Sequence, residues 1–308
     1  MNTMNNIPNF TKEHADQILA HVNVEAIRER KFKVVADMIN ASACVMDPYL
    51  FEQLGVELIP INNIPNGKFA HKPEPLRENL IETMETAKKL KADVGFVHDP
   101  DADRLVLVNE NGEVILEEYT LTLVAENILS KNPGKTFITQ LSTSRMSEDV
   151  AKKYGSECIR TAVGEPCVVE GIIKNNAILG GEGNGGVIYP TVNFVRDSFV
   201  GIALILELLA ERKKTVSELV ALFPKYFMKK EKYSLEGKDL KEIILKLKTH
   251  FKDAKTIEID GIRLDFPDNS WLHLHPSNTE PIVRLFGEAT TEERINTLFN
   301  EAKLTSGL

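Results

Sequence analysis

The stretch VGFVHDPDADR, residues 94–104, runs an apolar segment directly into three alternating aspartates, Asp99, Asp101 and Asp103. Such an apolar run predicts a buried strand, and open α/β sheets place their ligand sites just beyond the carboxyl ends of their strands. Three carboxylates this close repel one another unless a cation gathers them, and Mg²⁺ prefers oxygen ligands. The stretch therefore predicts metal-assisted chemistry on an oxyanion such as phosphate.

Two other interpretations of the aspartates are open to the sequence. An EF-hand loop also uses alternating acids, but it needs glycine at its sixth position, where Arg104 stands. A solvated acidic turn is the structural alternative, and it is disfavoured because carboxylates that follow a buried strand are costly without a cation.

Length and composition bound the fold and exclude some functions. The 308 residues suffice for two or three domains, and 43% hydrophobic with 27% charged residues is ordinary for a globular protein. A formal net charge of -8 and a sequence pI near 5.5 argue against a nucleic-acid binder, which needs a basic face. The three cysteines are widely spaced and form no Cys-x-x-Cys pair, which favours a reducing compartment over a disulfide framework or a zinc site.

Targeting signals are the next feature to consider. The N-terminus, MNTMNN, is polar and does not resemble a signal peptide. The longest apolar run, residues 199–210, is too short to span a bilayer and contains Glu207. We therefore expect a cytoplasmic protein with no membrane partner.

Hydrophobic periodicity predicts two successive α/β units followed by a small α+β domain. The predicted domains are residues 1–117 with the aspartates, 118–223 and 224–308, the last boundary falling at Phe223-Pro224. Predicted strands cover residues 32–36, 56–61, 94–97, 105–108, 114–116, 136–139, 157–161, 177–179, 271–275 and 282–286, with a strand pair around the Asp-Gly turn of residues 257–264. Predicted helices cover residues 47–54, 76–90, 197–212, 239–251 and 291–302.

Three further motifs follow the aspartates in the chain. They are TAVGE at residues 161–165, GGEGNGG at residues 180–186 and HPSNTEPIVR at residues 275–284. Together with DPDADR at residues 99–104, and in this order, they resemble the loops of the α-D-phosphohexomutases, a family that includes phosphoglucosamine, phosphomannose and phosphoglucose mutases. One such motif is weak, but four in order across nearly the whole chain are specific.

The resemblance implies that the two α/β units are tandem α/β/α domains with mixed sheets, and it implies a role for each motif. Asp99, Asp101 and Asp103 would hold Mg²⁺, and Arg104 would contact the phosphoryl group in transit, a role that suits its permanently charged fork. The remaining implied contacts are with the sugar phosphate, through Gly164, Glu182, Asn184, His275, Ser277, Asn278, Thr279 and Arg284.

The sequence departs from the commoner family pattern at three positions. In the glycine-rich motif Asn184 replaces a serine and Gly186 replaces a histidine, and in the last motif His275 stands at an arginine position. Histidine is only partly charged near neutrality and lacks the fork of arginine, so weaker or pH-dependent phosphate binding is expected. A flexible glycine turn and a capped turn between strands are the structural alternatives for these two motifs.

The function that the resemblance implies is isomerase activity by intramolecular phosphotransfer. Hexose 6-phosphate and 1-phosphate would be interconverted through a 1,6-bisphosphate, with glucosamine phosphate as the preferred substrate and mannose or glucose phosphate as alternatives. Family members carry a phosphoserine in a first domain, and no Thr-x-Ser-His-Asn type sequence occurs here. We therefore expect the chain to be inactive alone and to need a separate serine-bearing domain; the alternative is a non-catalytic protein that binds Mg²⁺ and sugar phosphate.

Overall fold

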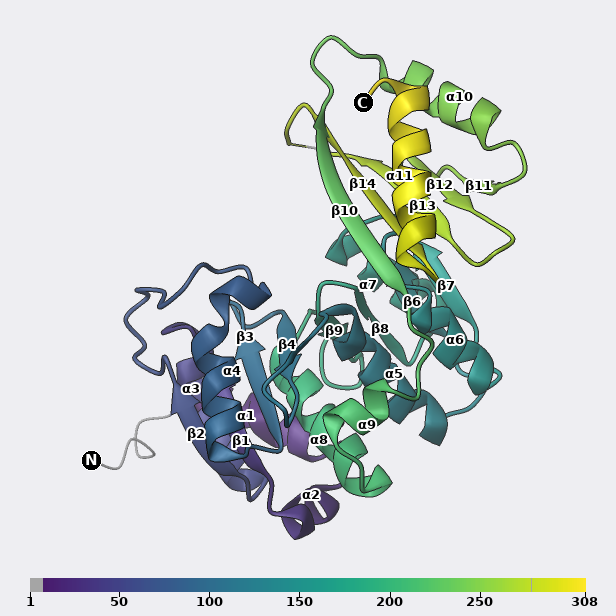
Figure 1. Cartoon of the computed structure of the whole chain (residues 1–308). Coiled ribbons are helices and arrows are strands. Elements are labelled where there is room, and N and C mark those ends of the chain that lie inside the picture. The colour runs from purple at the N-terminus through teal and green to yellow at the C-terminus, as the bar shows by residue number, and fades with distance from the viewer. Residues whose placement is uncertain (1–7, 278) are drawn as a thin grey trace. The chain divides into compact units, whose positions relative to one another are not determined.

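The computed structural model describes residues 8–277 and 279–308, which cluster into two compact units (Figure 1). Unit 1 comprises the chain up to Thr139, Met146–Ile159 and Glu165–Phe223. Unit 2 comprises Gln140–Arg145, Arg160–Gly164 and Pro224–Leu308. The division into three domains at residues 117 and 223 stays a prediction.

The first sheet of unit 1 is mixed and has the strand order β2-β1-β3-β4-β5. β1, β2 and β3 run parallel, whereas β4 and β5 are antiparallel additions joined by a turn at Gly112, whose φ is +76°. Pro60 lies in β2 at the sheet edge, where a residue without an N–H is tolerated. The bounds are β1 Lys33–Asp37, β2 Glu57–Ile61, β3 Val94–His98, β4 Leu105–Val108 and β5 Val114–Ile115.

Helices cover both faces of this sheet, and its central strands β1, β3 and β4 are accordingly buried on both sides. Alternate residues point to opposite faces: Val34 and Ala36 join the core formed with α1, α3 and α8, whereas Val35 joins a second core formed with α4. The bounds are α1 Asn9–Leu19, α2 Val24–Arg30, α3 Ala43–Gln53, α4 Ile81–Leu90 and α8 Ser198–Arg212, with a short 3-10 turn η2 at Arg77–Asn79.

A second mixed sheet has the order β7-β6-β8-β9. α7 packs on one face through Val168 and Ile172, and α5 packs on the other through Leu121. The bounds are α5 Glu118–Lys131, β6 Phe137–Gln140, α6 Met146–Lys153, β7 Cys158–Thr161, α7 Glu165–Asn175, β8 Leu179–Glu182, β9 Gly186–Ile188 and α9 Val216–Val220.

Unit 2 contains an antiparallel sheet of order β10-β14-β13-β12-β11, with α10 and α11 packed on one face. The bounds are β10 Phe227–Ser234, α10 Leu240–His250, β11 Lys255–Ile257, β12 Ile262–Asp265, β13 Trp271–Pro276, β14 Ile282–Ala289 and α11 Glu292–Ser306. The predicted architecture, two α/β/α layers with mixed sheets and a small α+β region, is confirmed.

Several predicted elements need correction. α3 begins at Ala43, so Asp47 lies inside the helix, buried, instead of capping it. α4 is shorter than predicted, and Leu76 of the expected apolar stripe is 45% exposed. β8 begins at Leu179 and contains the first glycines of the glycine-rich motif. Within residues 8–277 and 279–308, no helix combines the length and apolar character that a membrane crossing needs.

Candidate functional site

β3 delivers the metal loop, residues 99–104, to the carboxyl edge of the first sheet. Asp99 is fully buried, Asp103 is partly buried and Asp101 is exposed. One ligand atom from each carboxylate lies within 4.8 Å of those of the other two. A tight turn brings them together, closed by a hydrogen bond from the N–H of Ala102 to the carbonyl oxygen of Asp99 at 3.1 Å.

The carboxylates of the metal loop lie close enough together to shift one another's pKa. Asp99 accepts the backbone N–H groups of Asp103 and Arg104 at 3.1 Å and Nε of Arg104 at 2.5 Å. Burial acts to raise the pKa of Asp99, but these bonds from Arg104 hold the pKa below its ordinary value. Burial and the charge of Asp99 raise the pKa of Asp103 to about 7. Oδ1 of Asp103 is buried and accepts no hydrogen bond in the described part of the chain.

The glycine loop, residues 180–186, spans the end of β8 and the start of β9. Glu182 closes β8 and is only 4% exposed. Nδ2 of Asn184 donates to Oε2 of Glu182 at 3.0 Å, while Oδ1 of Asn184 accepts the N–H of Gly186 at 3.1 Å. Asn184 therefore closes the turn and orients the carboxylate of Glu182.

The glycine loop lies directly against the start of β4. The N–H of Leu105 donates to the carbonyl oxygen of Gly185 at 3.1 Å. Gly185 has a φ of +92°, and a Cβ on it would overlap the carbonyl oxygen of Leu105. Only glycine permits this approach, which makes the glycine loop a neighbour of the metal loop that precedes Leu105.

Arg196 contacts both loops, although no sequence motif pointed to this residue. Its Nη2 pairs with Asp103, its Nη1 lies 2.7 Å from Oε2 of Glu182, and its Nε lies 3.0 Å from Oε2 of Glu165. The guanidinium side chain is only 20% exposed. One cation is thus shared among three carboxylates that come from separate parts of unit 1.

A buried hydrogen-bond network around His98 connects the metal loop to α3 and α8. Nε2 of His98 lies 2.9 Å from Oδ2 of Asp47, and Nδ1 lies 2.8 Å from Oγ of Ser198, whose proton is donated to the carbonyl oxygen of Ala102 at 2.6 Å. Since that carbonyl can only accept, His98 donates to Ser198 from Nδ1 and to Asp47 from Nε2. Burial acts to lower the pKa of His98, but the charge and hydrogen bond of Asp47, together with the charges of Asp99 and Asp37, outweigh it, and the pKa is raised.

The phosphate loop, residues 275–284, spans the end of β13 and the start of β14 in unit 2. The strand register pairs His275 with Arg284, so both side chains share one face of the sheet. Oγ of Ser277 accepts the N–H of Thr279 at 3.4 Å and stabilises the turn. Asn278, predicted to contact phosphate here, lies outside the described residues.

The turn at Gly164 meets the phosphate loop through Asp260, also in unit 2. Nδ1 of His275 lies 3.0 Å from Oδ1 of Asp260, whose Oδ2 accepts the N–H of Val163 at 2.8 Å. The N–H of Gly164 donates to Oε1 of Gln140 at 3.0 Å. Gly164 and His275, predicted from separate motifs, are therefore joined within one unit.

Family models cover most of this architecture. Residues 12–112 match phosphoglucomutase/phosphomannomutase alpha/beta/alpha domain II, and residues 117–226 match alpha/beta/alpha domain III. The chain belongs to the α-D-phosphohexomutase family.

Individual relatives agree with this assignment. A phosphoglucomutase/phosphomannomutase of Thermococcus kodakarensis is 40% identical over 286 residues, which cover 92% of this chain and 62% of the relative. A probable phosphoglucosamine mutase of Pyrococcus horikoshii is 34% identical, over 96% of this chain and 65% of the relative. A crystal structure of a family protein from Burkholderia thailandensis aligns with a TM-score of 0.82 and 29% identity, over 96% and 64% of the two chains. The chain thus spans somewhat less than two thirds of the curated relatives' length.

The departures from the commoner phosphohexomutase pattern have a structural setting in unit 1. Gly186 occupies the position where the commoner pattern has histidine, and a Cβ on Gly186 would lie 2.5 Å from Cδ of Arg196. A side chain at this position would therefore displace Arg196 from Glu182 and Asp103. The position of Arg196 therefore depends on the absence of a side chain at Gly186.

The donor set of the metal loop fits the Mg²⁺ that the family implies. All three side chains offer oxygen. The buried Oδ1 of Asp103 accepts no hydrogen bond from the described residues, and a divalent cation would satisfy this oxygen and lower the raised pKa of the carboxyl. Of the predicted site residues, unit 1 contains Asp99, Asp101, Asp103, Arg104, Glu182 and Asn184, and unit 2 contains Gly164, His275, Ser277, Thr279 and Arg284.

Proposed function

We propose that this chain carries the metal, sugar and phosphate sites of a phosphohexomutase that interconverts hexose 6-phosphate and hexose 1-phosphate through a 1,6-bisphosphate, with glucosamine phosphate as the preferred substrate. The observation that carries the proposal is the junction in unit 1, where Arg196 pairs with both Asp103 and Glu182. Phosphoryl transfer depends on positioning the acceptor hydroxyl beside the charges that balance the phosphoryl group. The junction supports such an arrangement.

The metal loop would supply the positive charge that balances the phosphoryl group. Asp99, Asp101 and Asp103 would hold Mg²⁺, which when bound neutralises charge on the phosphoryl oxygens. Arg104, whose Nε contacts Asp99 at the same loop, would place its fork on the phosphoryl group.

The glycine loop and the phosphate loop would hold the sugar phosphate. The carboxylate of Glu182 would accept hydrogen bonds from two sugar hydroxyls, and Asn184 beside it would pair with a hydroxyl or an N-acetyl-type group. The residues assigned to the substrate phosphate are Gly164, His275, Ser277, Asn278, Thr279 and Arg284.

The phosphoryl donor would be a phosphoserine on the family's first domain, supplied as a separate partner or as another part of the same protein. A coupled mutase assay tests the whole proposal, with glucosamine 6-phosphate, Mg²⁺ and a trace of the 1,6-bisphosphate, with and without an added serine-bearing domain. We expect turnover only with the added domain and at least about 100-fold less with Asp101→Asn, since a metal ligand is lost. Asp253→Asn, an exposed change in unit 2, is the matched control.

A second candidate function, non-catalytic binding of Mg²⁺ and sugar phosphate, is favoured by one observation. His275 stands where the family has arginine, and its Nδ1 is engaged by Asp260 instead of facing a ligand freely. Calorimetric binding of glucosamine 6-phosphate without turnover, even when the serine-bearing domain is present, would support this candidate and contradict the mutase proposal.

A further inference from the structure

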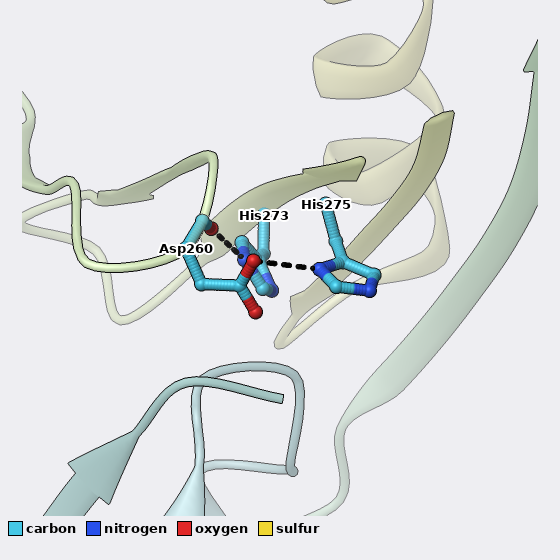
Figure 2. A group of neighbouring side chains, drawn as sticks. All are labelled: Asp260, His273 and His275. Atoms are coloured by element: carbon cyan, nitrogen blue, oxygen red, sulfur yellow. Dashed lines mark hydrogen bonds and ion pairs between the residues drawn. The ribbon is translucent and has the colours of Figure 1, made fainter. Parts of the chain in front are cut away.

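Three side chains of unit 2 converge on the sheet face opposite α10 and α11 (Figure 2). His273 and His275 are alternate residues of β13, so they point to the same face, while Leu272 and Leu274 pack into the core on the other. Asp260 approaches them from the turn between β11 and β12. One ligand atom from each of the three residues lies within 4.8 Å of those of the other two.

The turn that carries Asp260 is built to lie against β13. Gly261 has a φ of +65°, and a Cβ on it would overlap the carbonyl oxygen of Leu274. Because no side chain separates the turn from the strand, the backbone of Asp260 reaches the ring of His273. The carbonyl oxygen of Asp260 lies 2.8 Å from Nε2 of His273.

This contact decides which nitrogen of His273 is free to bind a ligand. A carbonyl oxygen only accepts, so Nε2 carries the proton, and in a neutral ring the lone pair is on Nδ1. Nδ1 of His273 is buried and has no hydrogen-bond partner among residues 8–277 and 279–308. A histidine that donates one N–H to a backbone carbonyl and offers the other nitrogen is the usual arrangement at a metal.

The other two residues complete the donor set. Oδ1 of Asp260 lies 3.0 Å from Nδ1 of His275, close to the spacing of about 3.3 Å between two ligands of one tetrahedral zinc ion. The Asp260 side chain is fixed by the N–H of Val163, which donates to Oδ2 at 2.8 Å. His273 is fully buried and His275 is 6% exposed, while the side chain of Asp260 is 15% exposed, so the site has one side that solvent can reach.

We propose that Asp260, His273 and His275 bind one divalent transition-metal ion, with Zn²⁺ as the best match. Two imidazoles and one carboxylate form a mixed nitrogen and oxygen set, which favours Zn²⁺ over the Mg²⁺ suited to the all-oxygen metal loop. Three protein ligands leave a fourth position for water or for a phosphate oxygen. The inference rests on unit 2 alone and does not require the proposed mutase activity.

The guanidinium of Arg263, beside His273, has a carboxylate partner of its own. Arg263 is paired with His273 across β12 and β13, but its guanidinium is held by Oδ1 of Asp265 at 2.9 Å and stacks 4.2 Å from the ring centroid of Trp271. The positive charge is therefore balanced by a carboxylate outside the proposed set.

The test is a zinc titration of the whole chain in competition with a coloured chelator, in excess Mg²⁺ to fill oxygen-only sites. We expect one Zn²⁺ per chain and a loss of affinity of about 100-fold or more in His273→Gln and in His275→Asn. Co²⁺ added in place of Zn²⁺ should give the intense visible bands of a tetrahedral site in the parent chain but not in these variants.

Two controls separate this site from the rest of the chain. His250→Asn removes a histidine of α10 that is 44% exposed, and Asp101→Asn disables the metal loop. Both should retain the bound Zn²⁺. The proposal is overturned if the parent chain binds no stoichiometric Zn²⁺, if Asp101→Asn abolishes binding, or if either site variant stays folded by circular dichroism and binds Zn²⁺ as the parent does.

Discussion

Arg196 compensates charge at the junction of the metal and glycine loops. It contacts Asp103, Glu182 and Glu165, all of which would repel one another in its absence. A metal ion at Asp103 would act on the same carboxylates, so the arginine and the cation share the task of balancing them.

Replacing Arg196 by glutamine should separate these contributions. We expect Arg196→Gln to lower the free energy of unfolding by about 1–3 kcal/mol, because hydrogen bonds to charged groups are lost in a partly buried place. Mg²⁺ should restore part of the loss, since it binds the folded chain and offsets the same charges. Urea unfolding with and without Mg²⁺ measures both effects. The exposed Arg77→Gln is the control, and an equal loss there would contradict the role assigned to Arg196.

His98 is a second residue whose effect is larger than its size suggests. It is fully buried between Asp47 and Ser198, so His98→Asn leaves the carboxylate of Asp47 buried without its partner. We expect a loss of about 3–5 kcal/mol in urea unfolding followed by circular dichroism. Adding Asp47→Asn to the same chain should recover part of the loss. If the two changes are additive, the pair is not coupled and this account is wrong.

His14 gives the stability of unit 1 a pH dependence. Its Nε2 lies 2.7 Å from Oδ2 of Asp197, and this hydrogen bond raises the pKa of His14 although burial opposes it. A raised pKa in the folded state gives stability that is complete below the unfolded value of about 6.5 and is lost as pH rises through the raised value. From about pH 6 to about pH 9, we expect His14→Asn to remove a decline of up to about 1 kcal/mol in unfolding free energy. His250→Asn should leave that decline unchanged.

At the scale of elements, the approach of β4 to the glycine loop depends on the absence of a side chain at Gly185. Gly185→Ala should cost about 2 kcal/mol or more, because the alanine would need both a φ of +92° and the space of the Leu105 carbonyl. Gly155→Ala is the matched control: its φ is +61° and nothing lies within 4 Å of the added Cβ, so about 1 kcal/mol is expected. Thermal unfolding of both variants measures the difference, and equal losses would contradict the close approach.

The sequence correctly predicted elements whose local residue pattern matches their burial in the fold. β4 is apolar throughout and β3 is apolar up to His98, and the helices predicted to begin at Asp197 and Asp239 are α8 and α10, which these two aspartates cap. The start of α3 was mispredicted because Asp47-Pro48 resembles a helix N-terminus. The carboxylate of Asp47 is instead a buried partner of His98, a contact 51 residues away in the chain.

β10 and Arg196 were missed for different physical reasons. β10 contains three lysines, which an edge strand tolerates. This polar composition lacks the apolar alternation by which a strand is recognised in a sequence. Arg196 belongs to no motif, and its partner Asp103 is 93 residues away. The sequence showed that Gly186 lacks the side chain of the commoner pattern, but it did not show that Arg196 occupies the space beside this glycine. Motifs therefore located the loops, while the contacts between loops required the structure.

At the scale of the molecule, the two units have separate apolar cores, and the single tryptophan of the chain, Trp271, is buried in unit 2. Tryptophan fluorescence should therefore follow unit 2 alone, whereas far-ultraviolet circular dichroism follows both units. We expect His98→Asn to move the circular dichroism transition to lower urea and to leave the fluorescence midpoint within about 0.2 M of the parent value. Equal shifts in both signals would show that the units unfold together.

Unit 2 is completed by chain segments made long before its strands. Arg263 of β12 donates to the carbonyl oxygen of Leu141, 122 residues earlier. At the usual pace of translation, about 5–20 residues per second, that carbonyl waits roughly 6–24 s for its partner. During this time the carbonyl of Leu141 is without its donor, so unit 2 cannot be completed before residue 263 has been made.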